Sequence, residues 1–325
     1  MNRSGTYVYL DNGSGAEMRC CVIGGAGFIG TWLVRELLAS GREVIALGRR
    51  SEPPPGFPAA ARYVVGGHGD TTLRSVLAEV DEIVDLAYAT VPQTSYADPV
   101  FDLLANLPPT VGLLEEARDS RLRKMVVVSS GGTVYGPVDR LPIVETSLTN
   151  PVSPYGITKL TIEKYALMFH RLHGVPVSIV RPGNAYGVGQ KPFTGQGFIA
   201  TAMGSILKGS DVTVFGESGT VRDYIHVRDV AQGIVAVLDQ GEAGEVYNIG
   251  SGIGRNNLEV LEAIAPLAKR ERLSLEIKFQ PARRFDVAAN VLDCTKLSAC
   301  SGWVPTVDFA DGLETMWESI LRETP

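Results

Sequence analysis

Tyr155 and Lys159 carry the side chains of this chain that are best suited to chemistry. On a helix, residues four apart project from the same face. A free tyrosine has a pKa near ~10, and a lysine ammonium held beside it favours the phenolate. Lowering the tyrosine pKa by about three units takes roughly 4 kcal/mol of differential stabilisation. A tyrosine tuned in this way can accept the proton of a hydroxyl group while hydride leaves the same carbon.

A glycine-rich loop of the kind that binds dinucleotides lies near the start of the chain. Gly24, Gly27 and Gly30 are spaced three apart, after a short apolar stretch and at the beginning of an amphipathic one. Glycines let the backbone turn sharply and approach a pyrophosphate, which then lies at the positive end of a helix dipole. In this strand–turn–helix context the loop predicts a dinucleotide site. The predicted cofactor-binding residues of the loop are Gly24, Gly27, Phe28, Ile29 and Gly30.

The end of the second predicted strand bears on which dinucleotide binds. NAD sites usually have Asp or Glu at this point for the ribose hydroxyls, whereas this chain has Gly48, Arg49 and Arg50. Two guanidinium groups could clamp the 2′-phosphate of NADP, although an arginine pair on the surface is an equally good interpretation. NAD and NADP therefore both stay open. Asp70, after the third predicted strand, is a candidate adenine contact, although Asp is common in turns.

Apolar stretches alternate with amphipathic ones through the first half of the chain. The predicted strands are residues 19–23, 43–47, 63–65, 82–87, 124–128 and 177–181, and the predicted helices are residues 28–40, 103–118 and 155–172. This alternation predicts an α/β fold with a Rossmann-type doubly wound parallel sheet. Beyond residue 181 glycine is more frequent and the strands are shorter, which predicts a smaller α/β C-terminal substrate domain.

These changes in composition and in strand length suggest that the chain has three parts. Residues 1–18 form an N-terminal extension, which lacks the charged and apolar regions of a signal peptide. Residues 19–181 form the NAD(P)-binding domain, with returning segments around 223–250. Residues 182–325 form mainly the substrate-binding domain, interleaved with the first.

The composition argues against several other classes of protein. The net charge of −6 over 325 residues gives no basic surface for nucleic acid. No apolar run approaches the ~18 residues that would span a bilayer. The cysteines lack metal-type spacing and indicate buried thiols in a reducing compartment. We expect a cytoplasmic protein that binds neither nucleic acid nor a membrane and holds no metal.

Hydroxyl side chains follow the predicted strand 124–128. Ser130 and Thr133 lie within the stretch from Ser129 to Gly136. Hydroxyls at the carboxyl end of a parallel strand face the cofactor cleft, where one could donate a hydrogen bond to the reacting oxygen. A polar turn leaving the sheet is the alternative interpretation.

Taken together, these motifs resemble the extended short-chain dehydrogenase/reductase family, specifically its nucleotide-sugar epimerase/dehydratase branch, from about residue 19 to the C-terminus. The resemblance implies two further cofactor contacts, Ala87 and Asn106. It implies that Asn184 touches the diphosphate of the substrate. Arg222 and Arg283 resemble the phosphate-binding arginines of the family and could grip a diphosphate from two sides.

Two positions depart from the patterns of particular branches. Dehydratases have acidic residues beside the catalytic Thr or Ser, but residues 131–136 contain no carboxylate, and eliminating water needs an acid and a base. The stretch resembles that of the epimerases, whose catalytic serine falls on Gly131 here, so we expect Ser130 or, next, Thr133 to serve. Relatives restricted to glucose and galactose carry a bulky tyrosine at the position of Asn290, which implies room for an N-acetyl group.

The resemblance therefore implies a nucleotide-sugar 4-epimerase with tightly bound NAD or NADP, acting on a UDP-hexose or UDP-N-acetylhexosamine. Tyr155 would deprotonate the C4 hydroxyl, and the 4-keto sugar would turn over before it is reduced on its other face. Lys159 would lower the tyrosine pKa and hold the nicotinamide ribose. An NADPH-dependent reductase of 4-keto nucleotide sugars and a non-catalytic dinucleotide-binding regulator are the alternatives. Relatives commonly dimerise through the helices at 103–118 and 155–172, so a homodimer is expected.

Overall fold

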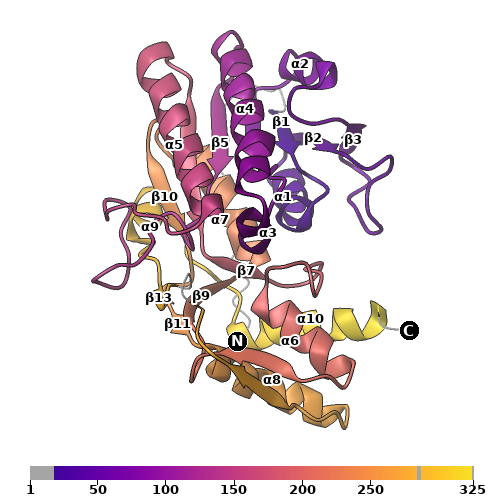
Figure 1. The fold of residues 1–325 in the computed structure, drawn as a ribbon. Helices are drawn as coiled ribbons and strands as arrows, with labels where there is room; N and C mark the ends of the chain where they lie inside the picture. The colour runs from indigo at the N-terminus through magenta and orange to yellow at the C-terminus, as the bar shows by residue number, and fades with distance from the viewer. Residues whose placement is uncertain (1–17, 284–286, 324–325) are drawn as a thin grey trace.

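The computed structural model describes residues 18–283 and 287–323 (Figure 1). Its centre is a seven-stranded parallel sheet with the strand order β10-β6-β5-β4-β1-β2-β3. These strands are β1 (Arg19–Ile23), β2 (Glu43–Gly48), β3 (Arg62–Val65), β4 (Glu82–Asp85), β5 (Lys124–Val128), β6 (Val177–Pro182) and β10 (Val246–Ile249). The doubly wound parallel sheet predicted from the sequence is confirmed.

Helices cover both faces of this sheet. One layer consists of α1 (Phe28–Ala39), α7 (Val227–Gln240) and α9 (Thr295–Ser301), and the other of α2 (Thr71–Leu77), α4 (Pro99–Arg118) and α5 (Pro154–His173). Successive side chains of a strand point to opposite faces, so Cys20 and Val22 pack into the first layer while Cys21 and Ile23 pack into the second. This double burial explains why β1 is apolar at consecutive positions. Within the described residues, no helix combines the length and apolar character needed to cross a bilayer.

Local signals fix both ends of α5. The Ser153 hydroxyl accepts a hydrogen bond from the Gly156 N–H (3.1 Å), and Pro154 occupies the first helical position. The helix ends at Gly174, whose φ of 73° lies in the left-handed region. The observed helix is therefore one residue longer at each end than predicted.

The neighbouring α4 packs against α5 and begins earlier than predicted. The Asp98 carboxylate accepts a hydrogen bond from the Phe101 N–H (2.9 Å), and Pro99 occupies the first helical position. This cap lengthens the helix at its start. The prediction placed the start at residue 103, because it overlooked the Asp-Pro signal.

The second half of the chain adds a smaller lobe, which lies below the sheet in Figure 1. In one small sheet, β9 (Val221–His226) pairs with β7 (Asn184–Tyr186), β11 (Gly254–Arg255) and β13 (Ala289–Asn290). In another, β8 (Val212–Phe215) pairs with β12 (Ile277–Gln280). The helices α6 (Phe198–Leu207), α8 (Asn257–Arg270) and α10 (Phe309–Glu323) pack around a core that includes Met203 and Trp317. A short helix, α3 (Pro92–Ala97), lies between β4 and α4.

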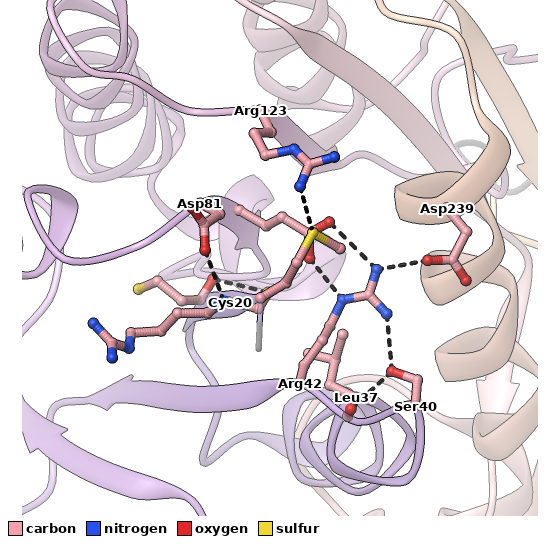
Figure 2. Close-up of polar contacts among 11 residues, drawn as sticks. Cys20, Leu37, Ser40, Arg42, Asp81, Arg123 and Asp239 are labelled. Carbon is pink, nitrogen blue, oxygen red and sulfur yellow. Dashed lines mark hydrogen bonds and ion pairs between the residues drawn. The ribbon is translucent and has the colours of Figure 1, made fainter. Parts of the chain in front are cut away.

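A buried ion-pair network ties α7 to the sheet (Figure 2). The Arg42 guanidinium lies 2.7 Å from the Glu82 carboxylate and 2.6 Å from that of Asp239, and it also donates to the Ser40 hydroxyl. The side chains of Arg42 and Glu82 are only 5% and 3% exposed, so water and salt screen this pair little. The network joins the end of α1, the start of β4 and α7, which directly follows β9. It thereby helps to hold β9 in place relative to the large sheet.

Candidate active site

A cavity of about 450 Å³ opens between the carboxyl ends of the large sheet and the smaller lobe. Its walls come from the segments that follow β1, β4, β5 and β6, together with β9 and the segment after β12. The predicted site residues that line it are Phe28, Ile29, Ser130, Thr133, Tyr155, Asn184, Arg222 and Arg283. Ligands of open α/β sheets bind at this edge, so the cavity is the candidate active site.

The glycine loop is built for close approach of a ligand to the backbone. Gly24 has a φ of 82° and anchors the loop through its N–H, which donates to the Leu47 carbonyl (2.9 Å). A Cβ atom at Gly30 would overlap the Gly24 carbonyl oxygen, so only glycine lets α1 lie directly against the loop. The first turn of α1 has no side-chain cap and no acidic residue. Its N–H groups and the positive end of its dipole are therefore available to an anion.

Tyr155 and Lys159 lie one turn apart on α5. Tyr155 lines the cavity, and its backbone N–H donates to the Ser95 hydroxyl (3.2 Å). Lys159 lies beneath, where its Nζ atom donates to the Val128 carbonyl oxygen (2.8 Å) at the end of β5. The same Nζ atom is 4.1 Å from the ring centre of Tyr88 and 5.9 Å from that of Tyr155. The spacing of four residues thus does bring the pair to one face.

Burial dominates the electrostatics of this pair. It raises the pKa of Tyr155, and the negative charge of Asp102 raises it further. Burial also lowers the pKa of Lys159 to about 8, against the opposing effect of Asp85, Glu163 and Asp102. The sequence alone predicts that the ammonium of Lys159 lowers the tyrosine pKa. It is instead hydrogen-bonded to the backbone of β5, while the phenol is desolvated.

Ser130 and Thr133 both line the cavity on the segment after β5. The Thr133 Oγ1 atom is buried and has no hydrogen-bond partner within the described residues. A serine at position 131 would not fit, because a Cβ atom there would lie 2.6 Å from Leu292 Cδ1 and 2.8 Å from the Arg181 carbonyl oxygen. The close packing of Gly131 therefore leaves no room for a side chain at this position.

The two arginines predicted to bind phosphate reach the cavity from different parts of the smaller lobe. Arg222, on β9, donates to the Val287 carbonyl oxygen (2.8 Å), and Arg283 follows β12 and stacks over Phe215 with its guanidinium carbon 4.2 Å from the ring centre. Next to Arg222, the buried Asp223 carboxylate accepts hydrogen bonds from backbone N–H groups of the loops after β10 and β13. These contacts fix β9 and hold its arginine in the cavity wall.

Several predicted cofactor contacts lie outside the cavity. Asp70 caps α2, where its carboxylate accepts a hydrogen bond from the Thr72 N–H (3.0 Å). Ala87 lies against the glycine loop, since a Cβ atom at Gly24 would lie 3.2 Å from the Ala87 nitrogen. The contacts of Asp70 and Ala87 with their neighbours in the fold account for both positions. The predicted pair Arg49 and Arg50 is exposed just beyond β2.

Two predicted asparagines position the backbone. The buried Asn106 on α4 accepts a hydrogen bond from the Ala89 N–H (2.7 Å) and so fixes the segment after β4. Asn290 is 1% exposed and donates to the Gly131 carbonyl oxygen (2.9 Å). It therefore contacts the segment that carries the candidate hydroxyls and does not line the cavity. The room for an N-acetyl group inferred from its small size has no direct counterpart in the cavity wall.

The sequence reasoning missed Asp102, a fully buried carboxylate four residues before Asn106 on α4. It also missed Tyr88, whose ring meets that of Tyr155 edge to face with a 4.8 Å centroid separation. The spacing of Asp102 and Asn106 on one helix face was an available signal. The position of Tyr88 had none, because its neighbours come from two distant helices.

Comparisons with known proteins identify the family. Residues 20–250 match the model of the NAD dependent epimerase/dehydratase family. The chain belongs to this family. It is similar to a UDP-glucose 4-epimerase of Mycolicibacterium smegmatis, with 34% identity over 91% of this chain and 96% of the relative. It is also similar to a dTDP-glucose 4,6-dehydratase of Streptomyces griseus, with 32% identity over 90% of each chain.

A solved structure supports the same assignment. The UDP-glucose 4-epimerase of Thermus thermophilus, crystallised in complex with NAD, matches with a TM-score of 0.86 and 33% identity, over 95% of this chain and 100% of that one. The resemblance to the extended short-chain dehydrogenase/reductase family is confirmed, and this family member is an enzyme of that type. Its relatives include both epimerases and dehydratases. The residues of its own site must therefore separate the two reactions.

Proposed function

We propose that this enzyme is an NAD-dependent nucleotide-sugar 4-epimerase that acts on a UDP-hexose or UDP-N-acetylhexosamine. One observation carries the proposal: Tyr155, the hydroxyls of Ser130 and Thr133, and the two arginines Arg222 and Arg283 line a single cavity. A proton acceptor and hydroxyl donors suit the C4 hydroxyl of a hexose. Two guanidinium groups suit a diphosphate.

The role proposed for each residue follows from its position in the cavity wall. Tyr155 would accept the proton of the C4 hydroxyl and later return one to the same oxygen. Because burial and Asp102 raise its pKa, it would act as a base from the small fraction present as phenolate. Thr133 or Ser130 donates a hydrogen bond to that oxygen, which holds it while its charge changes. Arg222 and Arg283 keep the diphosphate in place, so that the hexose can turn over without leaving.

The glycine loop would hold NAD, whose pyrophosphate would be bound by the uncapped N–H groups in the first turn of α1. Bound NAD would supply reversible hydride transfer at C4. Lys159, beside Tyr155 on α5, would hold the nicotinamide ribose with its ammonium. With a pKa of about 8, this ammonium keeps most of its charge at neutral pH. The NAD-bound relative from Thermus thermophilus favours NAD over NADP.

The residues of the cavity favour epimerisation over dehydration. Eliminating water needs a carboxylic acid and a base beside the sugar. Within the part of the chain that the structure describes, the cavity lining contains no Asp or Glu. Because the dehydratase relatives share the fold, this difference in the lining is what supports the epimerase.

A homodimer is proposed through α4 and α5. Their outer faces expose large apolar side chains, among them Phe101 (53% exposed) and Leu104 (58%) on α4 and Leu172 (65%) on α5. Apolar surface of this kind indicates an interface. Leu104→Glu should shift the protein from dimer to monomer in sedimentation, and an unchanged mass would contradict this interface.

The proposal is tested by incubating the purified protein with NAD and UDP-glucose or UDP-N-acetylglucosamine, and analysing the sugar by NMR. Formation of the C4 epimer with no net change in NAD is expected. A protein that yields no epimer from any common nucleotide sugar would reject the proposal.

An NADPH-dependent reductase of 4-keto nucleotide sugars is the second candidate. The observation that favours it is the exposed pair Arg49 and Arg50 beyond β2, where a 2′-phosphate would lie. A reductase consumes NADPH in step with product, whereas an epimerase consumes none. Following NADPH absorbance during turnover separates the two.

A further inference from the structure

A buried carboxylate, that of Asp102, lies close to the catalytic pair. Asp102 on α4 is 0% exposed and accepts hydrogen bonds from three hydroxyl groups. Two belong to Tyr88 (3.3 Å) and Thr90, on the segment between β4 and α3, and the third belongs to Thr158 on α5 (2.7 Å). An aspartate kept this far from water is costly unless its hydrogen bonds are made, and here they join three separate elements.

Two of these partners touch the catalytic pair directly. The Tyr88 ring packs edge to face on Tyr155, and the ammonium of Lys159 lies 4.1 Å from the centre of the same ring. Thr158 lies on the turn of α5 between Tyr155 and Lys159. Asp102 thus reaches both members of the pair without touching the cavity.

We propose that Asp102 is a positioning residue for the reaction, whose carboxylate fixes Tyr88 against Tyr155 and Lys159 and holds the turn of α5 that carries them. This rests on the proposed function, because it takes Tyr155 and Lys159 as the catalytic pair. Without this anchor, the Tyr88 ring and the helix turn could move independently. The phenol would then be misplaced relative to the sugar hydroxyl.

The charge of Asp102 also acts on the pair. Three carboxylates act on the ammonium of Lys159: Asp85 on β4, Asp102 on α4 and Glu163 on α5. The Asp85 carboxylate is also hydrogen-bonded to the imidazole of His68 (3.0 Å). Burial lowers the pKa of Lys159, and the negative charge of Asp102 opposes this by favouring the ammonium. The same charge raises the pKa of Tyr155. Removing this charge should therefore lower the pKa of both catalytic groups.

The test compares two variants that remove different things. Asp102→Asn preserves the shape of the side chain and removes its charge, whereas Thr158→Val preserves the charge and removes the tie to α5. Both are assayed for UDP-glucose epimerisation across pH. The two limbs of the kcat/KM profile report the pKa values of the two catalytic groups, Tyr155 and Lys159. We expect Asp102→Asn to move both limbs to lower pH. We expect Thr158→Val to leave the limbs in place and lower kcat by about 10- to 100-fold, with KM little changed.

Two results would overturn the proposal. One is a pH profile of Asp102→Asn that loses height but keeps the wild-type limbs, because a merely structural residue would do this. The other is a wild-type kcat in Thr158→Val. If Asp102→Asn does not fold, Tyr88→Phe decides instead: it keeps the ring, removes one tie, and should lower kcat at unchanged KM, while a wild-type kcat counts against the proposal.

A titration of Tyr155 in the NAD-bound protein distinguishes a failure of this proposal from a failure of the proposed function. The phenolate of Tyr155 is titrated by ultraviolet absorbance in NAD-saturated protein, as the difference from Tyr155→Phe, with and without Asp102→Asn. A step at lower pH in the Asp102→Asn background supports the proposal even if no nucleotide sugar turns over, a result that would reject only the function. An unmoved step overturns the proposal whatever the turnover.

Discussion

Replacing Lys159 with methionine should stabilise the folded protein while removing its activity. The lysine is 5% exposed, and burial lowers its pKa from 10.5 to about 8. Each pKa unit corresponds to about 1.4 kcal/mol, so a difference of about 2.5 units costs the folded state about 3 kcal/mol. Losing the hydrogen bond to Val128 offsets about 1 kcal/mol of the gain. A net gain of about 2 kcal/mol is therefore expected for Lys159→Met at neutral pH.

The difference in unfolding free energy between the wild type and Lys159→Met should depend on pH. Below pH 8 the lysine is charged in both the folded and unfolded states, so the full stability difference between the two proteins is present. Between pH 8 and the ordinary value of 10.5, the unfolded chain holds the proton and the folded chain does not. The wild type then gains stability relative to the variant as the pH rises, and the difference closes.

Urea unfolding of both proteins at matched NAD content, repeated from neutral to alkaline pH, measures this difference. All other titrating groups are common to the two proteins, so the difference isolates Lys159. A variant that is less stable at pH 7 would refute the reasoning. So would a stability difference that does not change with pH.

Three further substitutions test other parts of the structure. Arg222→Met should weaken UDP binding by about 10- to 100-fold in calorimetry, because a charge-assisted hydrogen bond to the diphosphate is lost, and unchanged affinity would contradict its role. Glu82→Gln should cost about 3–5 kcal/mol in urea unfolding because it breaks a buried ion pair, while Glu43→Gln, from an exposed pair, should cost less than about 1 kcal/mol, and equal losses would refute the distinction. Gly131→Ser should destabilise the protein by about 1–3 kcal/mol through its clash with Leu292, and adding Leu292→Ala should make the cost of the serine smaller; an unaffected melting temperature in the single variant would disprove the clash.

The parts of the fold that could be predicted are those with local signals. The consecutive apolar residues of β1 and the glycines after it predicted a sheet strand and a loop, and both are observed. The helix predicted at residues 155–172 matches α5 to within one residue at each end, where Ser153 and Gly174 form caps set by neighbours in sequence. The Asp98 cap of α4 was equally local and was simply overlooked.

The parts that could not be predicted depend on partners far along the chain. Asn290 resembled a substrate contact, but its amide bonds to Gly131, which is 159 residues away. The spacing of Asp102 and Asn106 hinted at a shared helix face, but the role of Asp102 depends on hydroxyl groups that the fold brings from either side. Likewise, the spacing of Tyr155 and Lys159 predicted a shared face but not the desolvation that controls their pKa values.

In the proposed reaction, Tyr155 moves the proton during inversion at C4 of a nucleotide sugar. The most direct measurement is the rate of UDP-glucose epimerisation by wild type and Tyr155→Phe with equal NAD content, together with UDP binding by each. We expect an epimer from the wild type, a loss of about 10²- to 10⁴-fold in the rate of the variant, and the same UDP affinity in both. A Tyr155→Phe protein that epimerises at the wild-type rate would contradict it.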